Sequence, residues 1–416
     1  MASEPLYSVD DRGNSWRGWL RARHVELLVL LFVALLPFGE SFHLPVLILL
    51  VLGVAEMRRK GIPRDRNLWL YAVVVVLLTA PLLISAPGAY RVDKTLLTAL
   101  IFLLYATAGL HVVRRFRRGL DGRLLLYGIG AILLFWAFDA LLQQFAGRNL
   151  FGWPYNGMRL TGIFHPDMRI GVVFAHLSPF LAAALHRYAL DSGRHWIWLL
   201  LVPVIAVILL SGSRAAWVTL LLVTLAYTAL LLHRRTYRWW RIVLLLAVAI
   251  GGSLLVSNDL QQRVAQTLQG FSTDVEAVNA ATSLRVEVWH GAWRLFLDSP
   301  VTGVGVEALP KLGFERGYMS FPFGHSHFYA LDVLLVTGVI GFAAYLAAFG
   351  IVCKKAIGVF RQAGTAFPYW LAAAAMMFPL NLHWEFHGVR PYAMMWLLLI
   401  LAFAVAGRDS AAQRTV

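Results

Sequence analysis

Residues 67–86 read NLWLYAVVVVLLTAPLLISA, and this stretch decides what kind of protein the chain forms. It contains no charged side chain and is as long as a helix that crosses a hydrocarbon layer of roughly 30 Å. A strand of a membrane barrel would be shorter and would alternate apolar with polar residues. A continuous apolar run is instead typical of a helix, which satisfies its own backbone hydrogen bonds in lipid. The stretch is therefore predicted to be a transmembrane helix.

The same pattern recurs along most of the chain. Of its 416 residues, 59% are hydrophobic and 14% are charged, a composition that water-soluble domains do not have. We therefore predict an all-α polytopic membrane protein with about twelve transmembrane helices. The predicted spans are residues 25–38, 43–56, 67–86, 93–113, 124–146, 168–188, 195–212, 214–233, 240–256, 328–350, 366–384 and 391–407. They divide the chain into 1–257 with spans one to nine, an extramembrane lobe at 258–327, and 328–416 with spans ten to twelve and a tail.

Positive charge alternates between the two sides of the predicted membrane. Basic residues precede span one, occupy the loops after spans two, four, six, eight and ten, and follow span twelve. Because short loops rich in Lys and Arg stay in the cytoplasm, both termini are predicted to be cytoplasmic. The first span follows Arg21 and Arg23 without a small-residue cleavage site, so we expect it to stay in the protein. Topology and anionic lipid headgroups then explain the net charge of +15, and nucleic acid is not an expected partner.

Two segments on the opposite, outer side are too long for simple turns. Residues 143–169 carry Gly and Pro residues that prevent one continuous helix. Residues 258–327 are the longest stretch between spans and are predicted to form a small helical lobe. Within this lobe, residues 258–271 and 284–300 have apolar side chains at a spacing of about four, which is typical of amphipathic helices at a membrane surface.

Three arginines on the outer side are candidates for binding an anion. Arg214 follows residues 211–213, SGS, in the tight turn between spans seven and eight, where backbone N–H groups at a helix start favour phosphate. Arg285 begins the second amphipathic helix, and Arg159 lies in the irregular segment 143–169. Each could instead be an ordinary solvated side chain, and Arg214 could extend to lipid headgroups. Together they suit a pyrophosphate, because guanidinium groups bind phosphate oxygens in bidentate fashion.

The chain returns to the membrane through GHSH, residues 324–327. Neutral imidazole accepts a proton near physiological pH, so His327 or His325 could act as a general base on a hydroxyl group. The alternative is a structural role for both histidines. No neighbouring set of carboxylates and cysteines completes a zinc or iron site, so neither a metal nor a cofactor is expected.

The last outer loop, residues 381–391, reads NLHWEFHGVRP and could line the same cavity as the arginines. The possible lining residues are Ser213, Trp289, His383, Glu385 and Arg390, and His387 lies among them. The alternative is an interfacial belt, in which Trp and charged residues anchor the ends of helices.

Taken in order, these segments resemble the bacterial O-antigen ligase and polymerase superfamily. That family has a helical membrane body, a late periplasmic loop, and a histidine before the following span. It often has Asn directly after the histidine, whereas Ser326 follows His325 and Phe328 follows His327 here. The spacing to Gly338 favours His327, and His325 stays an alternative. The matching motifs are SGSRAAW (211–217), LRVEVW (284–289), SPVTGVG (299–305) and GHSHFYALDVLLVTGVIG (324–341).

The resemblance implies a GT-C-like glycosyltransferase, specifically an O-antigen ligase, in the bacterial inner membrane, with its helical lobe and active site facing the periplasm. Its donor would be a glycan on undecaprenyl pyrophosphate, and its acceptor a sugar hydroxyl of the lipid A core. Arg214, Arg285 and Arg159 would hold the pyrophosphate. His327 or His325 would take the acceptor's proton in an inverting, metal-independent displacement. Membrane lipids would surround the body, and both substrate tails would stay in the bilayer.

Three other functions share parts of this pattern. A polymerase of the same superfamily would join repeat units to each other, but arginine-rich outer loops favour a ligase, whose acceptor carries core phosphates. A protein O-oligosaccharyltransferase commonly has a large C-terminal periplasmic domain, and a short cytoplasmic tail is expected here instead. A secondary transporter could also have twelve spans. However, the sequence shows no self-similar halves, and the candidate charges gather at one face.

Overall fold

The computed structural model of the protein describes residues 15–61, 65–117, 122–157, 159–235, 239–269 and 285–412. Within these ranges the prediction of an all-α protein is confirmed, and the only β feature is an isolated bridge between Arg148 and Pro154. Both chain ends lie outside the described residues, as do residues 270–284, where the two predicted amphipathic helices end and begin. The α-helices are α1 (Ser15–Leu35), α2 (His43–Lys60), α3 (Arg66–Ser85), α4 (Val92–Arg117), α5 (Arg123–Ala146), α6 (Ile170–Ser192), α7 (Leu201–Leu210), α8 (Arg214–His233), α9 (Trp239–Val256), α10 (Asn258–Gln269), α12 (Arg285–Asp298), α13 (Leu309–Glu315), α14 (Tyr329–Arg361), α15 (Phe367–Met376) and α16 (Val389–Ala412). Short 3₁₀ helices are η1 (Ala86–Gly88), η2 (Gly162–Phe164) and η3 (His195–Leu200).

Among the described residues, six helices are long and apolar enough to cross a membrane: α3, α4, α5, α6, α8 and α14. The bent pair α9 and α10 would add a seventh if it forms one span, and His195–Leu210 and Val389–Val405 are shorter apolar helices. Each of the twelve predicted spans overlaps a helix, but the count of twelve stays a prediction. The span predicted over residues 366–384 is wrong at its end. Helix α15 stops at Met376, because Pro379 restricts the backbone that precedes it.

Buried and outward-facing residues alternate on most of the long helices. On α3, Leu78 and Leu82 are buried, whereas Val76 and Leu83 are largely exposed, as expected of a helix with one lipid-facing side. Helix α6 is different, because 94% of the residues in its most apolar 18-residue stretch are buried. It contacts α5, α7, α8 and α15, while the buried part of α16 contacts α4 and α15. The bundle therefore has two halves, one around α6 and one around α16, and α15 joins them.

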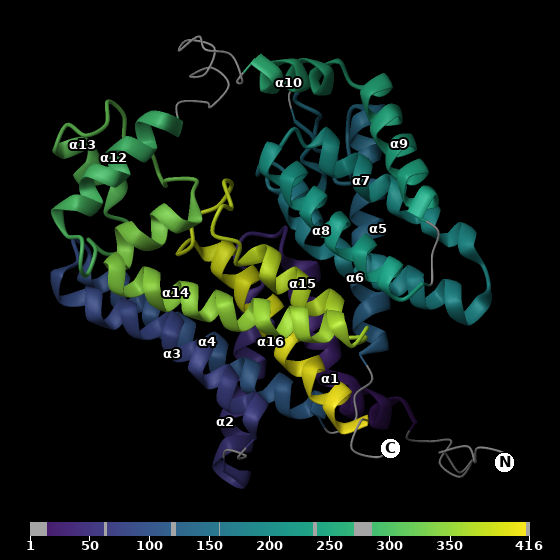
Figure 1. Cartoon of the computed structure of the whole chain (residues 1–416), viewed down its shortest axis with the longest axis horizontal. Helices are drawn as coiled ribbons and strands as arrows, with labels where there is room; N and C mark the ends of the chain where they lie inside the picture. The colour runs from purple at the N-terminus through teal and green to yellow at the C-terminus, as the bar shows by residue number, and fades with distance from the viewer. Residues whose placement is uncertain are drawn as a thin grey trace.

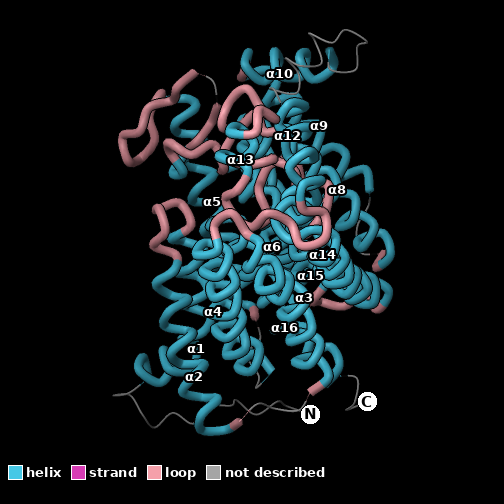
Figure 2. The backbone as a smooth tube through the Cα atoms, turned by 90° about the vertical axis from the view of Figure 1, so that its left-hand side faces the viewer, coloured by secondary structure: helices cyan, strands magenta, loops and turns pink. Residues whose placement is uncertain are grey.

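The helices of the predicted lobe lie at one end of the molecule. Figure 2 shows α10, α12 and α13 at the top, and α1 and α2 at the bottom. Helix α10 turns by 106° from α9 and lies over the half built around α6 (Figure 1). Helices α12 and α13 lie over the start of α14, with which they share a small apolar core that includes Val288, Leu309 and Leu335. The described parts of the predicted lobe therefore lie over different halves of the bundle.

The SPVTGVG segment fits into a break in α14. Gly338 interrupts this helix with φ +63° and ψ −166°, and a Cβ there would lie 2.2 Å from a backbone carbonyl oxygen, so only glycine fits. The break leaves the carbonyl groups of Leu335 and Val336 without partners in the helix. They accept hydrogen bonds from the N–H groups of Val304 at 2.9 Å and Gly305 at 3.1 Å. The motif thereby fixes the start of α14 and the loop before it.

Candidate active site

His325 and His327 lie side by side in the loop that leads into α14. Their ring centroids are 3.9 Å apart, with the ring planes inclined at 50°. Trp289 of α12 fixes this loop, because its indole N–H donates to the carbonyl oxygen of Ser326 at 2.9 Å. His327 has φ +53°, a left-handed conformation that is uncommon for residues with a side chain and clusters at functional sites. The predicted lining residue Trp289 therefore helps to position the two histidines through the backbone between them.

A hydrogen bond to the loop after α15 defines the protonation of His327. Its Nδ1 lies 3.0 Å from the carbonyl oxygen of His383. Because a carbonyl oxygen can only accept, Nδ1 carries the proton and Nε2 of the neutral ring keeps its lone pair. Burial lowers the pKa of His327 below its ordinary value, so the ring is neutral at pH 7. His327 therefore has the tautomer that a general base needs.

His383 connects the histidine loop to the turn between α7 and α8. Its Nδ1 lies 3.4 Å from the hydroxyl oxygen of Ser213. Ser213 is the N-cap of α8, and its hydroxyl accepts the backbone N–H of Ala216 at 3.4 Å. The turn is the tight hairpin predicted from the sequence, since α7 ends at Leu210 and α8 begins at Arg214. Three segments that are far apart in the chain thus meet at one point.

The three predicted arginines gather next to this point. Arg159, Arg214 and Arg285 are all half-buried. Burial lowers the pKa of Arg159, and the positive charges of Arg263, Arg285 and Arg214 lower it further. The pKa of Arg285 falls for the same two reasons, burial and the charge of Arg214. The structure therefore brings the three side chains within electrostatic range of one another.

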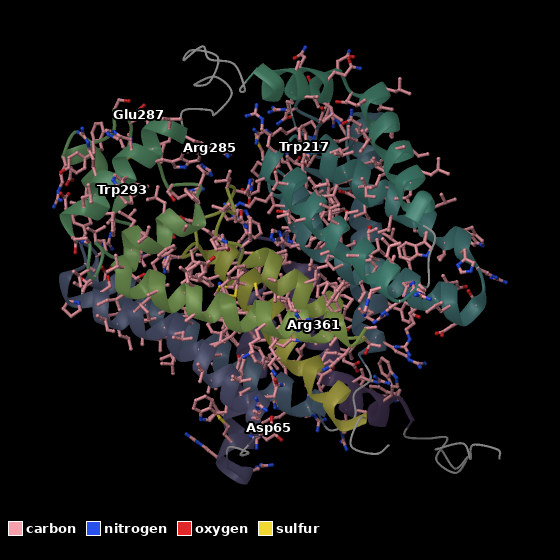
Figure 3. The ribbon with its side chains drawn as sticks, in the orientation of Figure 1. Asp65, Trp217, Arg285, Glu287, Trp293 and Arg361 are labelled. Atoms are coloured by element: carbon pink, nitrogen blue, oxygen red, sulfur yellow. The ribbon has the colours of Figure 1, made fainter. Side chains whose placement is uncertain are left out.

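Figure 3 shows how α12 presents Arg285 to this cluster. Arg285 lies on the side of α12 that faces Trp217 of α8, whereas Glu287 and Trp293 lie on the outer sides of the helix. Glu287 accepts hydrogen bonds from the backbone N–H and the hydroxyl of Ser320, and Trp293 is exposed. The charge of Arg285 also contributes, after burial, to the lowered pKa of His327. The amphipathic helix therefore directs its first arginine toward the histidine pair.

Arg263 of α10 is a fourth member of the cluster, and sequence reasoning missed it. Its side chain crosses Gly212 in the α7–α8 turn, where its Cδ and Nε lie 2.8 Å from the place that a Cβ of Gly212 would take. Gly212 also has φ +63°, so the turn and the passing arginine both require glycine there. Arginine is ordinary on the polar face of an amphipathic helix. No sequence signal therefore distinguished Arg263 from a solvated residue.

A carboxyl group lies next to His325. Oε2 of Glu385 is 3.9 Å from Nδ1 of His325. Burial, together with the negative charge of Asp332, raises the pKa of Glu385 to about 8. Burial and the neighbouring ring of His327 lower the pKa of His325 to about 4. Near pH 7, Glu385 is therefore mostly a neutral carboxyl group beside a neutral imidazole.

Asp332 holds the loop that carries Glu385. This aspartate lies in the first turn of α14, and its Oδ2 accepts hydrogen bonds from Nδ1 of His387 at 3.0 Å and from the N–H of Phe386 at 2.9 Å. The predicted lining residue Arg390 forms an ion pair with Asp167. Its charge is therefore compensated in the loop before α6, away from the arginine cluster.

The described residues contain no group of three or more His, Cys, Asp or Glu side chains placed to hold a metal ion. They do place an imidazole with an unprotonated Nε2 next to a cluster of guanidinium groups. Such a set can take a proton from a hydroxyl group and stabilise an anionic leaving group in the same place.

Residues 199–346 of the chain match the family described as O-antigen ligase. The matched segment contains Arg214, Arg263, Arg285 and both histidines, and it leaves out Arg159 and the loop with Glu385. No curated protein matches the chain at a significant level. The family match supports the O-antigen ligase and polymerase superfamily of membrane glycosyltransferase-like enzymes, and the apolar helices agree with a membrane protein.

Proposed function

We propose that the protein is an O-antigen ligase, which transfers a glycan from undecaprenyl pyrophosphate to a sugar hydroxyl of the lipid A core. In this proposal the enzyme lies in the bacterial inner membrane with both termini in the cytoplasm. The end of the molecule with α10, α12 and α13 then faces the periplasm (Figure 2). The body crosses the membrane twelve times, so that α1, α2, α9, α15 and the two shorter apolar helices contribute spans beside the six long ones.

One observation carries the proposal: the neutral His327, with Nε2 unprotonated, lies within the field of Arg285 and its cluster. Nε2 takes the proton of the acceptor hydroxyl, and the oxygen attacks the anomeric carbon of the donor. The new glycosidic bond forms as the bond from that carbon to the pyrophosphate oxygen breaks. The electron pair stays on the pyrophosphate, where the guanidinium groups stabilise the added charge. A single displacement of this kind inverts the anomeric configuration, and every group it uses belongs to this chain.

The membrane position suits two lipid-linked substrates. The candidate site lies where the α7–α8 turn, the loop before α14 and the loop after α15 meet, at the end of the apolar helices. Donor and acceptor tails can therefore remain in the bilayer while their headgroups meet above it. Holding both reactants in one site in this way also removes much of the entropic barrier to their reaction.

The test is O-antigen display in a strain that lacks its own ligase. Wild-type protein should restore long-chain lipopolysaccharide, and Arg214→Ala at matched membrane levels should restore little, because one arginine of the cluster is lost. A polymerase of the same superfamily would instead lengthen lipid-linked repeats in a polymerase-deficient strain. That result, with no ladder in the ligase-deficient strain, would replace ligation by polymerisation.

A further inference from the structure

A cavity of about 220 Å³ lies beside His325. Its walls come from the start of α4, residues 305–310, the first turns of α14 and the loop before α16. Among the described residues, no arginine lines it. His325 belongs to its wall, and the ring of His327 is 3.9 Å from that of His325 between centroids. The cavity therefore borders the histidine pair through His325, and its lining differs from the arginine cluster.

The polar groups of this cavity differ from those of the arginine cluster. Glu385, Glu307 and Asp332 line it, and the negative charges of Asp332 and Glu307 both help to raise the pKa of Glu385. Lys94 and Thr98 of α4 line the opposite wall. The cavity thus offers several hydrogen-bond acceptors and a few donors at spacings set by four separate segments. The negative charges of Asp332 and Glu307 disfavour a phosphate group there, although the positive charge of Arg169 also reaches Glu385.

We infer that this cavity binds the acceptor, as an unphosphorylated sugar unit whose hydroxyl groups bond to the carboxyl groups while one hydroxyl reaches the histidine pair. This inference rests on the proposed transfer to a sugar and adds where the acceptor binds and which sugar is selected. Glu385 and Glu307 accept hydrogen bonds from sugar hydroxyl groups, and Lys94 donates a hydrogen bond to a ring or hydroxyl oxygen.

The size of the cavity agrees with one sugar unit. A volume of about 220 Å³ holds about seven waters at roughly 30 Å³ each, so the cavity has room for a ligand with several hydroxyl groups. The loop that carries Glu385 is fixed by the hydrogen bonds of Phe386 and His387 to Asp332, so the site is formed before the sugar arrives. Preformed polar groups of this kind give orientation and specificity to a sugar site.

Separate KM values for donor and acceptor test the inference. Purified protein in nanodiscs is assayed with an undecaprenyl-pyrophosphate-linked glycan and a core-oligosaccharide lipid, at varied concentrations of each. Glu385→Gln and Glu307→Gln should raise the KM for the acceptor about tenfold, the usual effect of losing one hydrogen bond to a charged or polar group, and leave the donor KM within about twofold. Glu307 is exposed, so its substitution does not threaten folding. Glu315→Gln, an exposed carboxylate on α13 outside the cavity, is the matched control.

Binding without transfer separates this inference from the proposed function. Native mass spectrometry of the same nanodiscs measures binding of a dephosphorylated core oligosaccharide and of its phosphorylated counterpart. If wild type binds the dephosphorylated sugar and both glutamine variants weaken the binding of both forms, the cavity is a sugar site, even if no transfer is detected and ligation fails. If transfer proceeds but the variants change the donor KM, or change nothing, the inference is overturned while ligation stands.

Discussion

Two groups of charged side chains with opposite sign lie near the histidine pair. The arginine cluster contains Arg159, Arg214, Arg263 and Arg285, whereas the carboxyl side contains Glu385, Asp332 and Glu307, and the charge of Arg169 also reaches Glu385. Burial is the main cause of the lowered pKa values of Arg159 and Arg285, and repulsion between the arginines lowers them further, so a bound polyanion stabilises the cluster. The negative charges of Asp332 and Glu307 disfavour the same anion on the carboxyl side. The histidine pair therefore lies where the arginine cluster and the carboxyl side meet, which we call the charge boundary. The arginine cluster favours a pyrophosphate, and the carboxyl side favours a neutral hydroxyl group.

The largest effect on the rate of glycan transfer is expected from the two histidines at the charge boundary. Removal of the proposed base by His327→Ala should lower the rate of glycan transfer by about a hundredfold or more, the usual contribution of general base catalysis. His325→Ala should lower it less, because the hydrogen bond to His383 prepares the tautomer of His327. The measurement is kcat with purified protein at saturating donor and acceptor. If His325→Ala has the larger effect, the assignment of the base is reversed.

Substitution of the arginines is expected to have a smaller effect, mainly on kcat/KM for the donor. Arg285→Ala should lower kcat/KM for the donor by about ten- to a hundredfold, and Arg285→Lys should recover only part of it, because lysine lacks the planar fork that binds two phosphate oxygens. Arg294→Ala is the control, since Arg294 lies exposed on the same helix, over the ring of Tyr318. If Arg285→Ala instead lowers kcat/KM for the acceptor and leaves kcat/KM for the donor unchanged, the arginines do not bind the donor.

The sequence predicts the helices of this protein better than it predicts the charge boundary at the histidine pair. Continuous apolar runs and spacings of about four indicate α3 or α12, because both signals are local. The break at Gly338 lies inside such a run, and only the approach of residues 299–305 explains it. The motifs also identify Arg214, Arg285 and His327 as candidates. The meeting of His327 with His383, and of Arg263 with Gly212, depends on tertiary packing that no local pattern encodes.

The smallest effect is expected in the part of the pH dependence of stability that Glu385 contributes. Burial raises the folded-state pKa of Glu385 to about 8, above the ordinary value of 4.5 for a glutamate side chain. Between these two values the folded protein holds a proton that the unfolded chain releases, so stability falls as pH rises through this window, and the loss is complete above about pH 8. Glu385→Gln removes this dependence, whereas Arg285→Ala should keep it.

The thermal midpoint of the protein in detergent checks this expectation from about pH 5 to pH 9. The wild-type midpoint should fall by a few degrees relative to Glu385→Gln as the pH rises, a small shift because the carboxyl group is partly exposed. The Glu315→Gln control should follow the wild type, since Glu315 is exposed and lies outside the cavity. Parallel curves for wild type and Glu385→Gln would mean that Glu385 is already ionised near neutral pH. The charge difference between the carboxyl side and the arginine cluster would then be larger, because three ionised carboxylates would lie near the histidine pair.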